Sequence, residues 1–144
     1  MYRGWSKSPF CGVLRRWPAV SHEVCRTEIV ELHRFFESWF GGTIDDFSRF
    51  DRSVAGDFTM VGPGGERRDR DAVVRSLLDS HGSRTLAIRV ENAESWALGG
   101  GLLLARYEEW LDDKGRVSSA LFRENSDAPN GIEWVTVHET WLPL

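Results

Sequence analysis

Residues 102–123 read LLLARYEEWLDDKGRVSSALFR. The first part, Leu102 to Trp110, is rich in aliphatic and aromatic residues, as β-strands are. Asp112 to Gly115 is polar and ends in glycine, which is typical of a hairpin loop. Arg116 to Arg123 then has the composition of a returning strand. The stretch therefore predicts a long antiparallel hairpin.

Three helices are predicted before this hairpin. In the first, apolar residues recur at spacings of three and four, which gives one buried stripe, and Gly41-Gly42 ends the helix. Asp69 is a good N-cap for the third helix. We expect the helices at residues 23–40, near residues 45–54 and at residues 69–82.

Further strands are expected at residues 57–61, 86–91 and 132–141, with a tight turn at residues 62–65. Helices followed by antiparallel hairpins indicate an α+β fold with the helices on one face of the sheet. A chain of 144 residues, 41% of them hydrophobic, has the size and composition of one globular domain. We expect this domain at residues 22–144, after a flexible N-terminal arm at residues 1–21.

Composition argues against several kinds of partner. The net charge of −4 provides no basic field for nucleic acid, and no stretch approaches the roughly 18 apolar residues of a membrane span. Cys11 and Cys25 form neither a disulfide framework nor a metal-ligand spacing, which favours reduced thiols in the cytoplasm. His33 and Glu37 lack a third ligand, so no metal is predicted. We find no dinucleotide or phosphate-binding motif and expect no cofactor.

Three segments combine into a family resemblance. They read DFTMV at residues 57–61 before the GPGG turn, ARYEEWLD at residues 105–112, and WVTVH at residues 134–138. In this order the chain resembles the nuclear transport factor 2-like superfamily, which includes SnoaL-like proteins. It is most similar there to the calcium/calmodulin-dependent kinase II association domain and a related bacterial branch. The resemblance implies a cone-shaped, curved antiparallel sheet with three N-terminal helices that enclose a pocket, in a homodimer.

The resemblance also implies particular site residues. An arginine on the association domain's strand lies in a deep pocket that accepts carboxylates, and by register this position is Arg106. A second pocket arginine of that domain falls near Ser119, so the pocket of this chain should be less basic. Ketosteroid isomerases of the superfamily place a general-base aspartate before a proline, whereas Gly62 precedes Pro63 here. That proton-transfer chemistry is therefore not predicted.

Strand alternation suggests which side chains meet. It places Arg106, Glu108 and Trp110 on one face of their strand, and it groups Trp134 with His138 on the last strand. If both sets line the concave side of the sheet, the charged residues and His138 converge in a mostly apolar cavity, as in many small-molecule sites. An error of one residue in register would exchange the two faces.

These residues have alternative roles. His138 would act as a general acid or base, or it would be a pocket-wall histidine with a satisfied hydrogen bond. Arg106 would bind a carboxylate or pair with Glu108, and Glu108 is a second candidate for the base. The candidate catalytic residues are thus His138 and Glu108, and the candidate ligand-binding residues are Arg106, His138, Trp134, Ser119, Trp39 and Trp110.

The leading hypothesis is a small-ligand-binding, homodimeric domain for a carboxylate or another polar-headed molecule. One alternative is a cofactor-free cyclase, isomerase or dehydratase that uses His138. Another is an oligomeric interaction module whose pocket is closed by tryptophan side chains. We expect the dimer to form through the open sheet face, where Tyr107, Val135, Val137 and Trp141 would otherwise expose apolar surface.

Overall fold

The computed structural model describes residues 18–143. Of the flexible arm predicted for residues 1–21, positions 1–17 lie outside this range, and the chain is already helical at Pro18. The first helix therefore begins at Pro18 rather than at Glu23. Within the described range, no helix is long and apolar enough to cross a membrane.

The three helices are α2 (Pro18–Phe40), α3 (Ser48–Asp51) and α4 (Arg70–Asp79). The end of α2 is set by Gly42, whose φ of +72° is a left-handed conformation and whose N–H donates to the Trp39 carbonyl at 3.1 Å. The start of α4 is set by Asp69, whose side chain accepts a hydrogen bond from the Ala72 N–H at 2.8 Å. The predicted end of the first helix and the predicted N-cap are both confirmed.

The strands form one six-stranded sheet in the order β2-β1-β6-β5-β4-β3. All neighbouring strands are antiparallel except β1 and β6, which are parallel. The predicted hairpin is confirmed as β4 and β5. The predicted final strand has the observed bounds, whereas β2 was not predicted. The strands are β1 (Val54–Val61), β2 (Arg67–Asp69), β3 (Ile88–Gly99), β4 (Leu102–Leu111), β5 (Lys114–Glu124) and β6 (Ile132–Trp141).

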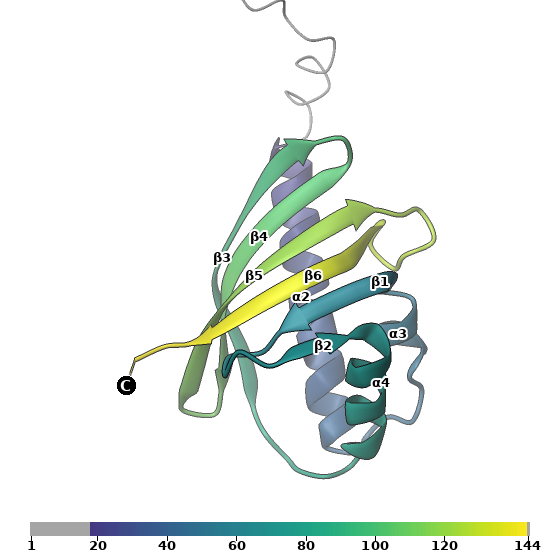
Figure 1. Ribbon diagram of the computed structural model, residues 1–144, viewed down its shortest axis with the longest axis vertical. Helices are drawn as coiled ribbons and strands as arrows, with labels where there is room; N and C mark the ends of the chain where they lie inside the picture. Colours follow the sequence, from purple (N-terminus) through teal and green to yellow (C-terminus); the bar gives the residue numbers. More distant parts are fainter. Residues whose placement is uncertain (1–17, 144) are drawn as a thin grey trace, which may run out of the picture.

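The helices and the sheet form two layers. Helix α2 runs along the concave face of the curved sheet, and α4 lies beside β1 and β2 at one end (Figure 1). Buried apolar side chains fill the space between α2 and the sheet. The opposite face of the sheet, which we call the outer face, is not covered by any described helix. The predicted α+β architecture is therefore confirmed.

Side chains of β4 alternate between these two faces. Leu103, Ala105, Tyr107 and Glu109 are buried on the face toward α2, whereas Arg106 is exposed. The expectation that the even-numbered residues of this strand line the concave side is therefore wrong. The odd-numbered residues line it, which is the one-residue exchange to which strand patterns are prone.

Strand β6 contains a β-bulge. Its pairing with β5 shifts by one residue, since Leu121 pairs with Thr136 whereas Phe122 pairs with Trp134. Val135 is the extra residue, and it lies between the two paired positions. Alternation along β6 is interrupted at this point.

The bulge reverses the faces of the second half of β6. Trp134, Val137 and Glu139 are all buried on the concave side, whereas His138 is exposed on the outer face. The expected grouping of Trp134 with His138 is wrong because regular alternation does not continue through a bulge. Tyr107 and Val137 are buried within the protomer, so they do not supply the exposed apolar surface expected to drive dimerisation.

A fully buried carboxylate joins the elements of the molecule. Glu28 of α2 accepts hydrogen bonds from Arg49 of α3 at 2.7 Å, from the Asn130 side chain at 2.7 Å and from the Trp134 indole at 2.9 Å. A buried carboxylate is tolerated only when it is paired and hydrogen-bonded. These contacts hold α2, α3 and the start of β6 together.

Candidate functional site

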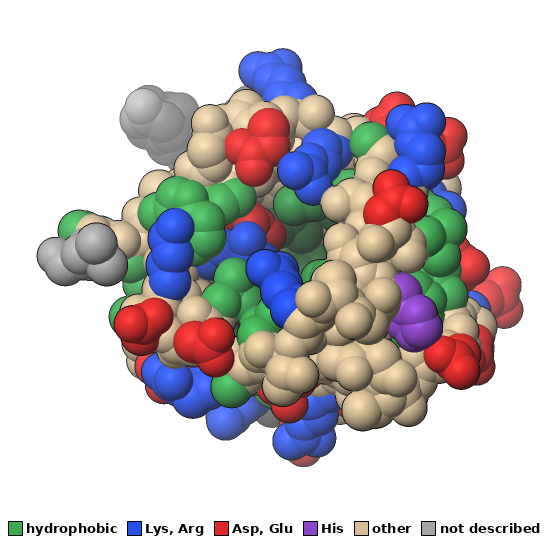
Figure 2. Space-filling model, turned by 90° about the horizontal axis from the view of Figure 1, so that it is seen from below, with side chains coloured by type: hydrophobic (Ala, Val, Ile, Leu, Met, Phe, Trp, Pro, Cys, Tyr) green, Lys and Arg blue, Asp and Glu red, His purple; other side chains and the backbone are tan. Residues whose placement is uncertain are grey.

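Two adjoining cavities lie between α2, α4 and the concave face of the sheet. The inner cavity has a volume of about 70 Å³, and the outer cavity has a volume of about 420 Å³. Viewed from below, the molecule shows a hollow with hydrophobic and acidic side chains inside and basic side chains around its edge (Figure 2). The two cavities have six lining residues in common, which we call the neck: Phe36, Met60, Val73, Glu109, Arg116 and Glu139.

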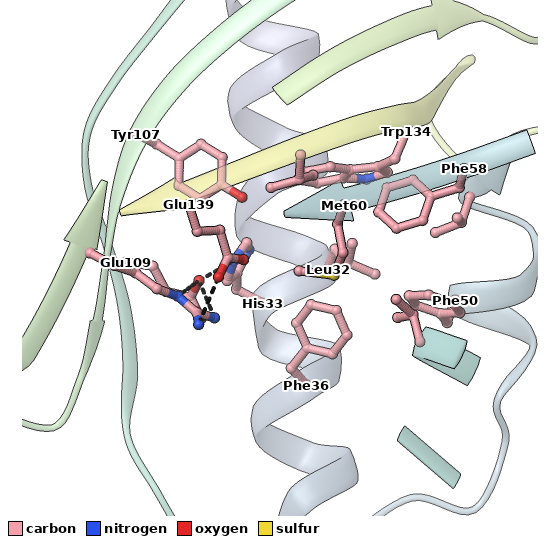
Figure 3. Close-up of a pocket in the computed structure, with 14 residues that line it drawn as sticks. Leu32, His33, Phe36, Phe50, Phe58, Met60, Tyr107, Glu109, Trp134 and Glu139 are labelled. Atoms are coloured by element: carbon pink, nitrogen blue, oxygen red, sulfur yellow. Dashed lines mark hydrogen bonds and ion pairs between the residues drawn. The ribbon is translucent and has the colours of Figure 1, made fainter. Parts of the chain in front are cut away.

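The inner cavity is mainly apolar. Its walls come from α2, α3, β1 and the sheet, and aromatic rings predominate among them (Figure 3). Trp134 and Tyr107 close its upper side, and their ring centroids are 6.3 Å apart. Such a cavity suits a small apolar group, because only polar groups with partners are stable at this depth.

His33 lies at the side of the neck with an acceptor at each ring nitrogen. Its Nδ1 lies 2.6 Å from the carbonyl oxygen of Ile29, and its Nε2 lies 3.3 Å from Oε2 of Glu109. Both contacts are favourable only if both nitrogens carry a proton. Burial opposes a charge on the ring, but the Glu109 carboxylate outweighs it and raises the pKa of His33. The two acceptors therefore favour the doubly protonated, cationic form of the His33 ring.

Glu109 is held ionised by two cations. Arg116 donates to it from Nε and from Nη2, each at 2.9 Å, in the two-pronged geometry that suits a guanidinium and a carboxylate. Burial would raise the pKa of Glu109, but His33 and Arg116 together lower it to about 2. Because its oxygens are occupied, Glu109 positions Arg116 and His33 and is not free to accept a proton.

Glu139 is the carboxylate of the neck that has the fewest partners. Only 7% of it is exposed, and its Oε2 lies 2.8 Å from Nη1 of Arg116, without the alignment of a hydrogen bond. Burial is the largest influence on its pKa and raises it. Arg116 opposes this effect and Glu109 adds to it, so the pKa is about 7. Glu139 is therefore ready both to take up and to release a proton near neutral pH.

The sheet register explains how this cluster is assembled. Glu109 pairs with Arg116 and Tyr107 with Ser118 between β4 and β5, and Ser118 pairs in turn with Glu139 of β6. Burial raises the pKa of the Tyr107 phenol well above its ordinary value, so this side chain stays neutral. The cluster was missed in the sequence, although the same alternation with the opposite phase on β4 selects Tyr107 and Glu109.

The predicted polar site residues come together, but on the other side of the sheet. Arg106 pairs with Ser119, and Ser119 pairs with His138, so these three form one row across the outer face. The Arg106 guanidinium lies over the Trp96 ring at 5.7 Å and donates to the Ser119 hydroxyl at 3.4 Å. Arg106 and His138 are exposed there. The prediction that they line the interior pocket is therefore wrong.

The other predicted site residues separate. Glu108 accepts a hydrogen bond from the Trp110 indole at 3.1 Å, and both side chains lie on the outer face. Trp39 is buried and donates to the Leu77 carbonyl at 2.7 Å, as a core residue. Trp134 lines the inner cavity as expected. In the described part of the chain, no group of three or more potential ligands could hold a metal, and Glu37 accepts from the Ile88 N–H instead.

Comparison with solved structures defines the class of the protein. An NTF-2-like protein of unknown function from Pseudomonas aeruginosa matches with a TM-score of 0.70 and 23% identity, over 83% of this chain and 99% of that one. The CaMKII hub of S. rosetta matches with a TM-score of 0.67 and 12% identity, over 83% and 95% of the two chains. A cystatin-like protein from Caulobacter vibrioides has a TM-score of 0.61 and 16% identity, over 82% and 89%. The fold is nuclear transport factor 2-like, as the sequence predicted.

A family model then places the chain more narrowly. Residues 25–143 match the model described as sucrose-6-phosphate phosphohydrolase C-terminal, and the chain belongs to this family. A search of curated proteins gave no significant match.

Proposed function

We propose that this chain is a small-ligand-binding domain. The ligand places an apolar end in the inner cavity and a hydrogen-bonding group at the neck. The observation that carries this proposal is the buried Oε2 of Glu139, which lies where the two cavities meet and has an ion-pair contact with Arg116 but no aligned hydrogen bond. A ligand that donates a well-aligned hydrogen bond to this charged oxygen would gain about 1.5–3 kcal/mol.

The surrounding charges select the head group. Arg116 directs its donors toward Glu109 and Glu139, so its guanidinium is already engaged by two carboxylates. At the neck, a carboxylate ligand would lie next to these two acidic side chains, whereas Arg68 and Arg84 line the outer cavity. A hydroxyl or amine, which donates to Glu139, fits better than the carboxylate considered from the sequence. The family description names part of a hydrolase and provides no ligand for this pocket.

Ligand-observed NMR with four six-carbon probes tests the proposal: 1-hexanol, hexylamine, hexanoate and hexane-1,6-diol. We expect the alcohol and the amine to bind more tightly than hexanoate. Substitution Glu139→Leu removes the acceptor and should abolish this preference while apolar contacts persist. Glu108→Gln changes a carboxylate on the outer face and serves as the matched control. If the wild-type protein binds none of the four probes at millimolar concentration, the proposal is wrong.

The proposal includes a homodimer formed through the outer face. Trp96 and Leu98 are 42% and 54% exposed at one edge of that face, and Leu102, Leu104 and Leu121 are half-buried beside them. A second protomer that covers these side chains would remove apolar surface from water. The two open cavities are unlike the tryptophan-closed pocket expected of a pure interaction module.

A further inference from the structure

We propose that Glu139 makes the pocket select its ligands according to pH. When this carboxylate is ionised, the neck takes hydrogen-bond donors, above all alkylamines in their cationic form. When the carboxyl group is protonated, it donates a hydrogen bond itself, and the neck takes neutral acceptors such as ketones. This inference rests on the proposed function, because the polar group of the ligand meets Glu139 at the same neck.

Two carboxylates of the neck share one guanidinium, and they share it unequally (Figure 3). Arg116 donates two aligned hydrogen bonds to Glu109, whereas its Nη1 lies 2.8 Å from Oε2 of Glu139 without the alignment of a hydrogen bond. Glu109 also has Nε2 of His33 at 3.3 Å. Two buried carboxylates beside the same cation repel each other, so the one with fewer partners takes up a proton more readily. That carboxylate is Glu139.

Charged groups on several elements act on Glu139. Burial has the largest effect and raises its pKa, Arg116 of β5 and His33 of α2 lower this pKa, and Glu109 of β4 raises it. Glu66, in the turn between β1 and β2, adds a further negative charge that raises it. The result is a pKa of about 7, so Glu139 changes its charge near neutral pH.

The other polar groups of the two cavities keep their charge over this range. Tyr107 of β4 stays neutral, because burial raises the pKa of its phenol well above the ordinary value. Arg68 of β2 and Arg84, which precedes β3, line the outer cavity as exposed side chains, and a guanidinium does not lose its proton in proteins. His33 has its ring nitrogens directed at Ile29 and Glu109 and not at the ligand. Among these groups, Glu139 is the one whose titration changes what a ligand meets.

The proton on Glu139 reverses the hydrogen bonding that the neck offers. An ionised carboxylate only accepts, so it suits an ammonium group and leaves a ketone oxygen without a donor. A protonated carboxyl group donates through its hydroxyl, so it suits the ketone. It also leaves an ammonium group without an anion of its own, because Glu109 is already engaged by Arg116 and His33. A buried cation without a partner is strongly disfavoured, so amines should bind weakly in acid.

The test uses hexylamine and 2-hexanone, two six-carbon probes whose own charge does not change between about pH 5.5 and 8.5. Ligand-observed NMR titrations measure their dissociation constants at a series of pH values. Over this range the ionised fraction of Glu139 rises from about 3% to about 97%, and apparent affinity follows the fraction of protein in the competent form. From low to high pH we expect the affinity of the wild-type protein for hexylamine to rise by about 10-fold or more, and that for 2-hexanone to fall by a similar factor.

Substitution Glu139→Gln provides a neck that cannot ionise but still donates a hydrogen bond. This variant should bind 2-hexanone at every pH, bind hexylamine weakly at every pH, and show no pH dependence for either probe. Glu108→Gln, on the outer face, should keep the full pH dependence of the wild-type protein and is the matched control. Circular dichroism verifies that each variant is folded, and the wild-type series tests the selection without any substitution.

Each other result refutes a specific statement. If both probes bind the wild-type protein with affinities that do not vary with pH, selection by pH is wrong and the binding proposal stands. If both affinities change in the same direction, pH alters the whole pocket and does not select between donors and acceptors. If Glu139→Gln keeps the wild-type pH dependence, another group is responsible and the role given to Glu139 is wrong. If neither probe binds at millimolar concentration at any pH, the binding proposal fails as well.

Discussion

At the scale of single residues, two buried groups of the pocket, His33 and Glu139, have raised pKa values that their residue types alone do not predict. The acceptors at both ring nitrogens raise the pKa of His33, and burial raises the pKa of Glu139 by more than Arg116 lowers it. Both groups bind protons more tightly in the folded chain than in the unfolded chain. By linkage, both make the fold more stable at lower pH within their titration ranges.

The pH dependence of stability should show the contribution of Glu139. Its pKa of about 7 in the folded protein exceeds its ordinary value of 4.5. The stabilisation is therefore fully present below about pH 4.5 and is lost as pH rises through 7. Over this interval we expect the free energy of unfolding to fall by on the order of 2 kcal/mol more in the wild-type protein than in Glu139→Gln. Urea titrations at a series of pH values measure the difference.

Comparing the two proteins removes contributions that they share, including those of His33 and Glu109. Parallel curves for the wild-type protein and Glu139→Gln would mean that the pKa of the Glu139 carboxyl is not shifted on folding. A steeper fall in the variant than in the wild-type protein would mean that folding lowers this pKa instead of raising it.

At the scale of helices and strands, Glu28 links three elements that the sequence alone does not connect. Its carboxylate takes hydrogen bonds from α3, from the loop before β6 and from β6 itself. Replacement by glutamine, which carries no charge and has one acceptor oxygen, removes the ion pair between Arg49 and a fully buried carboxylate and leaves fewer acceptors for the Asn130 and Trp134 donors. We expect Glu28→Gln to lower the free energy of unfolding by about 3 kcal/mol, measured by chemical denaturation.

Glu31 provides the matched control on the same helix. Its side chain is 43% exposed and lies 3.4 Å from the same Arg49. Glu31→Gln should change stability by less than about 1 kcal/mol, as exposed ion pairs do. If both variants lost the same free energy of unfolding, the burial of Glu28 would not explain its contribution to stability.

The elements themselves were largely predictable, and the faces they present were not. The end of α2 at Gly41-Gly42, the cap at Asp69 and the strand at residues 132–141 follow from local chemistry that acts within a few residues. The face of a strand depends on phase, and nothing in the residues 102–110 distinguishes the odd from the even set before the strand is packed. Glu109 and Glu108 are adjacent and chemically identical, yet one is buried and the other lies on the outer face.

At the scale of the whole molecule, none of the helices in residues 18–143 covers the outer face of the sheet. We expect the wild-type protein to sediment as a dimer at micromolar concentration, because its exposed aromatic and aliphatic side chains favour burial. Trp96→Glu places a charge on this face and should shift the protein toward the monomer. Sedimentation velocity across a concentration series measures the shift.

Leu78 allows a control for simple surface hydrophobicity. It is 49% exposed, close to the exposure of Trp96, but it belongs to α4. Leu78→Glu should leave the sedimentation coefficient unchanged. A monomeric wild-type protein, or equal dissociation in both variants, would contradict a dimer through the outer face.

The bulge at Val135 determines which side chains of β6 face the pocket. Ahead of the bulge, Trp134 belongs to the core; beyond it, one extra residue decides whether the cavity meets Val137 and Glu139 or Thr136 and His138. In a relative without this bulge, the second half of the strand would shift by one residue. The pocket would then contain the imidazole in place of the carboxylate, although the amino-acid sequence of the strand would be almost the same. For relatives with this fold, the register of the last strand therefore predicts which side chains line the pocket better than the residue types of its motif do.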